Sequence, residues 1–389
     1  MIPAGKSADD AIKRVKRVML VVGEASGDLH GAHLVKSLYR RDPTLEVLAV
    51  AGEGLKREGV KVLFDVDQLT GMGFAELAGN LRTLWQAYRR LRGILRRERP
   101  NLLVLIDFPE FNLRLARVAK KLSIPVLYYI SPQVWAWRRR RVQKIARWVD
   151  RMAVVFPFEV PLYQKEGVPV SFVGHPLLDV VRATQPRETT LREYGLEPTR
   201  RTIALLPGSR KREVTYHLPA MLEAANRLSK EMEVQFILAR ANTVERAIFE
   251  AMLHQAAVKV PIAEGNTYNI LHASDLAWTA SGTATLETAL MLRPMIIVYR
   301  LAWLTYGLAR LLVRVNHIGM VNIVAGEAVV PELIQSEVTA ERIVVESRAI
   351  LRDEVSRQRM VSKLAQVKER LGRPGAAERV ADIALSMIS

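Results

Sequence analysis

Short runs of aliphatic and β-branched residues alternate with longer amphipathic segments along the chain. In the first half of the chain these runs are 18–22, 47–51, 102–106, 126–130 and 152–156. The intervening segments have helical spacing, so the pattern predicts a parallel sheet with helices on both faces. After the first run, the glycine-rich segment 23–31 predicts a turn, and 32–40 predicts a helix.

The same alternation starts again after a polar segment, 185–201. This segment contains Pro186, Gly195 and Pro198, which predicts a linker. Further strands are predicted at 202–206, 234–238, 276–278 and 295–299. We therefore expect an α/β protein of two doubly wound, Rossmann-like domains that face a cleft. The expected limits are 1–185 and 195–365, with a charged helical tail over 366–389.

Composition removes several classes of protein and of site. The 389 residues are 49% hydrophobic and 25% charged, which is typical of a globular chain. The chain has no cysteine, which excludes disulfides, thiolate metal sites and a cysteine nucleophile. Its seven histidines lack paired ligand spacing, so no metal site is predicted.

The charge balance points to an acidic partner. Lys and Arg number 57 against 40 Asp and Glu, a net charge of +17. Nucleic acid, anionic lipid and phosphorylated substrates all fit, and so does a merely solvated basic surface. No apolar run of 18 residues lacks charge, so no membrane-spanning helix is predicted.

Three segments could provide the contact with such a partner. Segment 80–99 is an arginine-rich amphipathic helix, which fits an anionic membrane surface or packing on its own sheet. Segment 69–74 is an apolar, glycine-rich turn that could face lipid. Segment 131–141 sets tryptophans beside four arginines, which suits stacking on bases, gripping phosphates, or an ordinary basic helix face.

In the first half, polar residues follow two predicted strands. Segment 23–33, GEASGDLHGAH, has small residues that let a ligand approach the backbone, but it matches neither the dinucleotide fingerprint nor the P-loop. Its alternative is a tight turn capped by Ser26 or Asp28. Asp107 lies at the carboxyl end of a predicted strand and is either a general base or the cap of the next helix.

In the second half, two Gly-Ser/Thr turns follow predicted strands. Gly208, Ser209 and Arg210 can clamp a phosphate, or they form a turn with a basic run. The segment 281–283, Ser-Gly-Thr, opens a helix whose amides can hold a diphosphate. Glu287 lies one turn further on, where a carboxylate can accept hydrogen bonds from sugar hydroxyls. The alternative is an ordinary capping box.

Eight motifs in order resemble the lipid-A-disaccharide synthase family. They are GEASGD (23–28), IDFPEFN (106–112), YYISPQVWAWRRRR (128–141), FPFE (156–159), FVGHPLLD (172–179), LLPGSR (205–210), SGTATLE (281–287) and NIVAGEAVVPEL (322–333). The resemblance covers about residues 18–383 and implies a type-B glycosyltransferase fold whose C-terminal helices cross back to the first domain.

The resemblance also implies an activity. The family transfers 2,3-diacylglucosamine from UDP-2,3-diacylglucosamine to 2,3-diacylglucosamine 1-phosphate, with inversion, and forms the β-1,6 disaccharide 1-phosphate of lipid A and UDP. It implies no cofactor, no metal and no nucleic-acid partner. The expected location is cytoplasmic, peripheral on the inner face of the inner membrane, against an anionic membrane surface. A homodimer is left open.

Site residues carry over by position from the matching motifs. The catalytic candidates are Asp107, Asn322 and Glu24. The substrate-binding candidates are Ser26 and Asp28, with Glu24, on the acceptor side, Gly208, Ser209, Arg210, Ser281, Gly282 and Thr283 at the diphosphate, and Glu287 at the ribose. One departure is Glu327, which stands where the family usually has arginine after Ala-Gly, so any anion contact of that arginine is in doubt.

Three alternatives remain open from the residues. A peptidoglycan N-acetylglucosaminyltransferase and a UDP-N-acetylglucosamine 2-epimerase share the fold and the UDP-sugar site. A basic nucleic-acid-binding protein would use 131–141 and would show strongly salt-dependent binding. It leaves the glycine turns at the strand ends unexplained.

Overall fold

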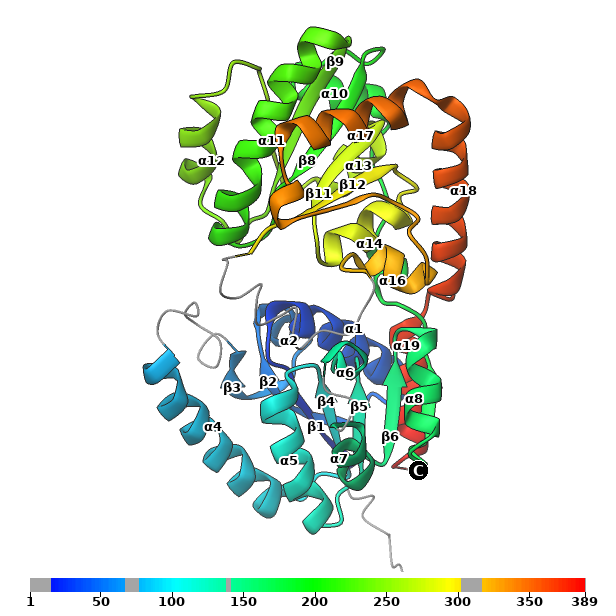
Figure 1. Ribbon diagram of the computed structural model, residues 1–389. Helices are drawn as coiled ribbons and strands as arrows, with labels where there is room; N and C mark the ends of the chain where they lie inside the picture. Colours follow the sequence, from blue (N-terminus) through cyan, green and yellow to red (C-terminus); the bar gives the residue numbers. More distant parts are fainter. Residues whose placement is uncertain (1–14, 67–76, 138–140, 302–316, 389) are drawn as a thin grey trace, which may run out of the picture.

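Two parallel sheets form the two halves of the molecule (Figure 1). The computed structural model describes residues 15–66, 77–137, 141–301 and 317–388. The first sheet has seven strands in the order β3-β2-β1-β4-β5-β6-β7, and the second has six in the order β10-β9-β8-β11-β12-β13. Every paired strand in both sheets runs parallel to its neighbour.

The strand limits follow the hydrophobic runs closely. The first sheet contains β1 (Arg17–Val21), β2 (Glu46–Ala51), β3 (Lys61–Asp65), β4 (Leu102–Ile106), β5 (Val126–Tyr129), β6 (Arg151–Val154) and β7 (Val170–Phe172). The second contains β8 (Arg201–Leu206), β9 (Val234–Arg240), β10 (Ile262–Glu264), β11 (Leu276–Ala280), β12 (Met295–Tyr299) and β13 (Glu332–Ile334). The four strands that the pattern missed, β3, β7, β10 and β13, all lie at sheet edges, and three of them have only three residues.

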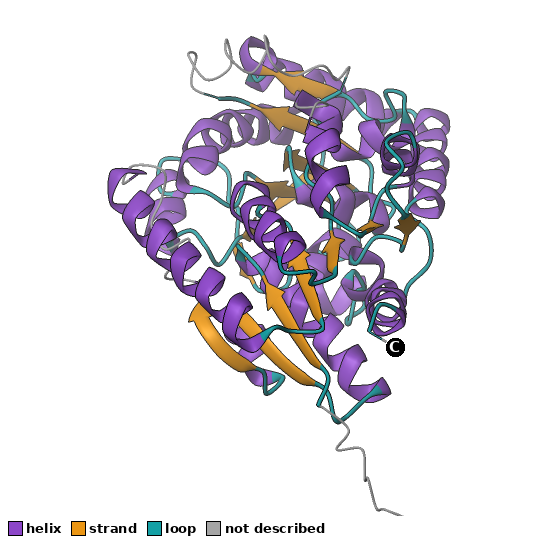
Figure 2. Cartoon of the chain, turned by 90° about the horizontal axis from the view of Figure 1, so that it is seen from below, coloured by secondary structure: helices purple, strands orange, loops and turns teal. Residues whose placement is uncertain are grey.

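Helices pack against the sheets, and the strands lie between helices except at the sheet edges, such as the strands at the lower left of Figure 2. In the first half these are α1 (Ala25–Arg41), α2 (Glu53–Arg57), α4 (Leu77–Glu98), α5 (Pro109–Lys121), α6 (Val134–Trp137), α7 (Arg141–Trp148), α8 (Val160–Gln164) and α9 (Leu177–Val180). In the second half they are α10 (Arg187–Glu193), α11 (Lys211–Glu231), α12 (Arg246–Leu253), α13 (Thr267–Ala273), α14 (Thr283–Leu290), α16 (Met320–Ala325) and α17 (Ala340–Arg352). The predicted fold class, two doubly wound α/β domains, is confirmed.

One predicted boundary is wrong. The turn expected over 23–31 is mostly helix, because α1 begins at Ala25 rather than at residue 32. Its glycines serve packing instead of turning. A Cβ at Gly31 would lie 3.1 Å from side-chain atoms of both Leu20 and Leu55, so glycine lets α1 lie close to the sheet.

The C-terminal helices return to the first half. Helix α18 (Glu354–Arg370) runs down from the second half, and α19 (Ala376–Ser386) packs on α1 (Figure 1). Arg41 at the end of α1 pairs with Asp382 on α19, with Nε and Oδ1 2.6 Å apart. The crossing helices therefore tie the two halves together.

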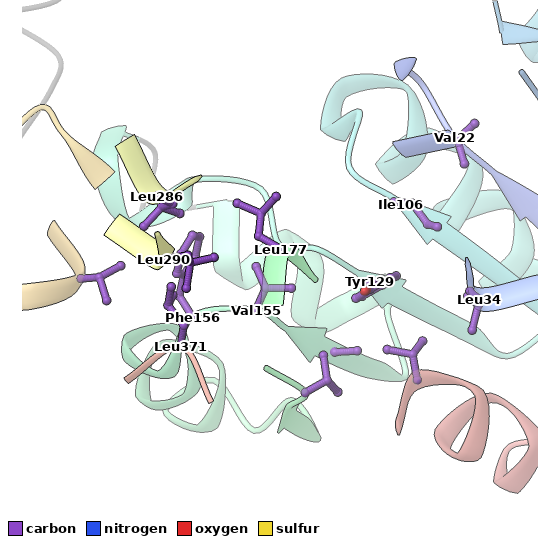
Figure 3. Close-up of a cluster of buried hydrophobic side chains, with 14 of the residues drawn as sticks. Val22, Leu34, Ile106, Tyr129, Val155, Phe156, Leu177, Leu286, Leu290 and Leu371 are labelled. Atoms are coloured by element: carbon purple, nitrogen blue, oxygen red, sulfur yellow. The ribbon is translucent and has the colours of Figure 1, made fainter. Parts of the chain in front are cut away.

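An apolar cluster continues from one half into the other. Figure 3 shows Tyr129 in the first half and Leu286 in the second, with Phe156, Leu177 and Leu371 in the same buried cluster. Burial of such side chains contributes about 1.5–3 kcal/mol each, so the contact between the halves rests largely on this cluster.

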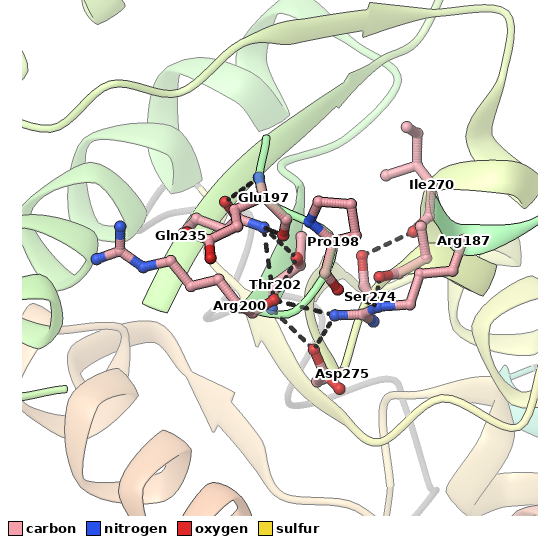
Figure 4. A network of polar contacts seen from close by, with 10 residues as sticks. Arg187, Glu197, Pro198, Arg200, Thr202, Gln235, Ile270, Ser274 and Asp275 are labelled. Atoms are coloured by element: carbon pink, nitrogen blue, oxygen red, sulfur yellow. Dashed lines mark hydrogen bonds and ion pairs between the residues drawn. The ribbon is translucent and has the colours of Figure 1, made fainter. Parts of the chain in front are cut away.

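A polar network fixes the segment where the chain enters the second half (Figure 4). Arg187 pairs with Asp275 at 3.0 Å, and the same carboxylate oxygen accepts from the Thr202 amide at 2.8 Å. Gln235 Nε2 donates to the Glu197 carbonyl at 2.6 Å and to the Thr202 hydroxyl at 2.9 Å. The linker is thereby bound to the starting ends of β8, β9 and β11.

Candidate active site

Most of the candidate residues lie where the strand order of each sheet reverses direction. In the first sheet β1 and β4 are neighbours, and in the second β8 and β11 are neighbours. At such a switch point the chain leaves the two strands toward opposite faces, which opens a crevice at their carboxyl ends. Glu24 and Asp107 follow β1 and β4, while the two Gly-Ser/Thr turns follow β8 and β11.

A pocket of about 200 Å³ opens at the second switch point. Six of the residues predicted to bind substrate line it: Gly208, Ser209, Ser281, Gly282, Thr283 and Glu287. Gly282 has a φ of 144° and nothing within 4 Å of the position of a Cβ, so the backbone there is open to a ligand. The start of α14 adds its positive dipole end to this pocket.

In the turn after β8, a carboxylate of the protein itself occupies the hydrogen-bond donors. The amide of Ser209 donates to Glu213 Oε2 at 2.9 Å, and Arg210 Nη1 lies 3.2 Å from Glu213 Oε1. Gly208 has a φ of 132°, and a Cβ there would lie 2.5 Å from the Glu213 Cβ. Because the Arg210 side chain is 76% exposed, it can turn from Glu213 toward a phosphate.

Buried His217 links the same turn to the strand beyond. Its Nε2 accepts from the amide of Arg300 at 2.9 Å, so its Nδ1 carries the proton that is donated to the Pro207 carbonyl at 2.8 Å. Burial lowers the pKa of this imidazole, which keeps it neutral in that tautomer. No motif indicated this role, because His217 and the Arg300 amide are 83 residues apart along the chain.

A second pocket of about 360 Å³ adjoins the first and shares Glu287 with it. Tyr268 donates to Glu287 Oε1 at 3.0 Å. Burial raises the pKa of the Glu287 carboxyl, and the Tyr268 hydrogen bond opposes that shift. Arg182, Arg240, Asn266 and Tyr268 also line this pocket. Sequence reasoning missed these four, since none stands in a recognisable motif.

Glu24 and Asp107 lie close enough to interact at the first switch point. Burial raises the pKa of the Asp107 carboxyl, and the negative charge of Glu24 raises it further. Glu24 is exposed at the N-terminal end of α1, and its side chain makes no capping hydrogen bond. Two carboxylates with different exposure are therefore available at the end of the first sheet.

Asp107 stands in a strained turn. Asp107 and Phe108 both have a φ of 48°, in the left-handed region that costs a residue with a side chain roughly 1–2 kcal/mol. Gly23 makes room for this turn, because a Cβ there would lie 2.2 Å from the Phe108 ring. Strain of this kind clusters at functional sites.

Ser26 and Asp28 lie on the first turns of α1 but differ in exposure. Ser26 is exposed, beside Glu24. Asp28 is buried and accepts three backbone hydrogen bonds, from Gly52 at 2.7 Å, Gly54 at 2.7 Å and Leu55 at 3.2 Å. Its carboxylate therefore caps the start of α2, a different helix from the one the sequence suggested.

Asn322 is fully buried in α16 and bonded on all sides within the protein. Its Nδ2 donates to the Val330 carbonyl at 2.9 Å and to Glu332 Oε1 at 2.8 Å. Its Oδ1 accepts from the amides of Val329 and Val330. The Asn322 amide thus connects α16 to the segment before β13 by hydrogen bonds. Asn322 lines neither of the two pockets described above.

Comparison with known proteins identifies the family. The model of the lipid-A-disaccharide synthetase family matches residues 18–384. The chain is 48% identical to the lipid-A-disaccharide synthase of Geobacter metallireducens, over 96% of this chain and 97% of that one. It is 49% identical to that of Syntrophus aciditrophicus, over 96% and 98%. The chain belongs to the lipid-A-disaccharide synthetase family.

Among solved structures, the fold resembles a UDP-N-acetylglucosamine 2-epimerase from Neisseria meningitidis bound to UDP-GlcNAc. The TM-score is 0.65 over 95% of this chain and 100% of that one, at 14% identity. Such low identity shows the fold alone. The sequence relatives therefore decide between the activities that share it, and they favour the synthetase over the epimerase, the peptidoglycan enzyme and a nucleic-acid-binding protein.

Glu327 forms an ion pair with Lys363 on α18 at 2.7 Å. Lys363 lowers the pKa of this carboxyl. Arg370 of α18 donates nearby to the carbonyls of Val324 and Ala325. In this member of the family, the end of α16 is thus bound to the crossing helix.

The segments considered for an acidic partner differ in exposure. Helix α4 buries Ala87, Leu91 and Leu95 in the first half, so its apolar stripe packs on its own domain. The arginines of segment 80–99 are exposed, and so is Trp85, at 55%. Segment 69–74 lies outside the described residues.

Trp135 does not present a free ring. It is buried and packs edge-on against Phe158, with ring centroids 5.3 Å apart. Arg141 pairs with Glu110 and is largely covered. Within the described ranges, no helix is long and apolar enough to cross a membrane. In that same part of the chain, no group of three or more His, Asp or Glu side chains is arranged to hold a metal.

Proposed function

We propose that the chain is a glycosyltransferase that joins two acylated glucosamines. It transfers 2,3-diacylglucosamine from UDP-2,3-diacylglucosamine to 2,3-diacylglucosamine 1-phosphate, and forms the β-1,6 disaccharide 1-phosphate and UDP. The observation that carries this proposal is the family match over residues 18–384, with candidate residues at both switch points.

The donor belongs to the second domain, residues 195–365. The diphosphate would lie against the amides of the 208–209 and 281–283 turns and take the place of the Glu213 carboxylate at Ser209. Arg210 would follow the phosphate and balance the charge on the departing UDP. Glu287 would accept from the ribose hydroxyls in the recess that it shares with Tyr268.

The acceptor belongs to the first domain, residues 1–185, beside Glu24 and Ser26. Asp107 would take the proton of the 6-hydroxyl as that oxygen bonds to the sugar C1 and the bond from C1 to the diphosphate breaks. A raised pKa makes Asp107 a stronger base than an exposed aspartate once it is ionised. The tail, 366–389, holds the first domain through α19.

The site of action would be the inner face of the inner membrane, because both substrates carry acyl chains. The exposed arginines of α4 support this, as each basic residue near an anionic leaflet contributes about 1 kcal/mol. Trp85 lies among them, with the Arg89 guanidinium 4.6 Å from its ring centroid, and amphipathic rings favour the headgroup layer.

The base role is tested with Asp107→Asn, which keeps the size of the side chain. Turnover of the two acylated substrates should fall at least about a hundredfold, the usual contribution of a general base. UDP affinity and the unfolding transition should stay close to the parent values. Turnover near that of the parent would remove Asp107 as the base.

The membrane role is tested with charge reversal of Arg89, Arg92 and Arg96, which are exposed on α4. The variant should no longer sediment with phosphatidylglycerol-containing vesicles.

The matched control reverses Arg192, Arg342 and Arg359, which are exposed on helices elsewhere. It should still sediment with the vesicles. If both variants bind, or if both are released, α4 is not the docking surface.

A further inference from the structure

The polypeptide turns sharply at the end of β4, and neither of the two left-handed positions in the turn is a glycine. Asp107 and Phe108 are both left-handed, and neither is a residue type that adopts this conformation freely, although aspartate tolerates it better. The β-ladder ends here with a long hydrogen bond of 3.4 Å from the Asp107 amide to the Tyr129 carbonyl. Other contacts must therefore hold the turn.

Two buried side chains supply them. The Asp107 carbonyl accepts from the Tyr128 hydroxyl at 2.6 Å and from Asn112 Nδ2 at 2.7 Å. Asn112 Nδ2 also donates to the Ile106 carbonyl at 3.2 Å. Both side chains are fully buried, Tyr128 in β5 and Asn112 in the first turn of α5, so the donors themselves are fixed.

The side chains of Tyr128 and Asn112 contribute hydrogen-bond donors to the turn. Among the described residues the buried Oδ1 of Asn112 has no hydrogen-bond partner, whereas its Nδ2 donates to two carbonyls, so this amide acts on the turn through its N–H groups. The hydroxyl is the single polar atom of the Tyr128 side chain, and it donates to the Asp107 carbonyl. The Phe108 ring, stacked on Phe111 with centroids 5.3 Å apart, holds the other side of the turn.

We propose that Tyr128 and Asn112 are positioning residues that lock the left-handed turn and so aim the Asp107 carboxylate at the acceptor hydroxyl. This inference rests on the proposed function, in which Asp107 is the base. Both side chains act on the backbone of that one residue, and neither has to touch substrate. Without them the peptide at 107 can relax to an unstrained conformation that moves the carboxylate away.

Tyr128→Phe is the direct test, because it removes one oxygen and leaves the ring. We expect kcat to fall about ten- to a hundredfold, as for a misplaced catalytic group, with KM for both substrates within about twofold of the parent. The pH at which kcat rises to its plateau should also move, because the surroundings of the carboxyl change. A merely structural hydroxyl would alter stability without this split between kcat and KM.

Tyr129→Phe is the matched control. The two tyrosines are adjacent in β5 and equally buried, but their rings lie in different apolar clusters on opposite faces of the sheet. The control should keep kcat within about twofold. Equal losses in the two variants, or a parental kcat and pH profile in Tyr128→Phe, would overturn the proposal.

Asn112→Leu keeps the test decisive if Tyr128→Phe does not fold, since leucine is close in size and removes the amide donors. The same loss of kcat at constant KM is expected, and a parental kcat would overturn the proposal. Asp107→Asn distinguishes a failure of the base assignment from a failure of the positioning role. If it retains turnover, the base assignment fails. If it loses turnover while Tyr128→Phe does not, the positioning role alone fails.

Discussion

Asp28→Asn separates a structural carboxylate from one that binds substrate. In the structure Oδ1 accepts from the amides of Gly52 and Leu55, and Oδ2 accepts from that of Gly54. An asparagine that keeps Oδ1 in place turns its own N–H group toward the Gly54 amide. The charge of the carboxylate is lost, and the partly buried Gly54 amide then faces a second donor instead of an acceptor, which costs about 2–3 kcal/mol.

Urea unfolding measures this cost as a lower midpoint with an unchanged slope. In folded protein below the transition, kcat and KM should stay near the parent values, because the carboxylate faces α2. Glu53→Gln is the control, since Glu53 is the exposed carboxylate on the first turn of the same helix, and it should barely move the midpoint. A parental midpoint for Asp28→Asn together with lost turnover would contradict the structural role and return Asp28 to the acceptor side.

Three further predictions concern the binding turns and the base. Arg210→Ala should weaken UDP binding about ten- to a hundredfold by calorimetry, as expected for a lost charged hydrogen bond, and an unchanged Kd would exclude the clamp. Glu213→Gln should tighten UDP binding, because the carboxylate now occupies the Ser209 amide; weaker binding would contradict that competition. Glu24→Gln removes a negative charge that raises the pKa of Asp107, so the acid limb of the kcat profile should shift to lower pH. If the acid limb stays at the same pH, the charge of Glu24 does not act on the pKa of Asp107.

Strong local signals made most of the fold predictable. Buried parallel strands are continuous apolar runs, so β4 and β12 have the predicted limits, whereas the short edge strands β7 and β13 carry too little pattern to detect. The glycine turns after β8 and β11 were found because they follow strands, and parallel strands bring those ends together at one edge of the sheet.

The sequence could not reveal which candidate polar groups already have hydrogen-bond partners within the protein. Asp28 and Asn322 stand in motifs like the other candidates, but their partners are set by tertiary packing. The helix start at Ala25 was missed because Gly27 and Gly31 were read as turn residues rather than as close contacts with the sheet. Tyr268 lacked any signal, since its neighbour Glu287 lies on a different helix.

The proposed activity is decided by turnover of the two acylated substrates. Purified protein would receive UDP-2,3-diacylglucosamine and 2,3-diacylglucosamine 1-phosphate in mixed micelles with EDTA, and the disaccharide 1-phosphate and UDP would be measured. We expect both products in equal amounts. No disaccharide from these substrates, with UDP-N-acetylglucosamine epimerised instead, would contradict it and leave only the fold in place.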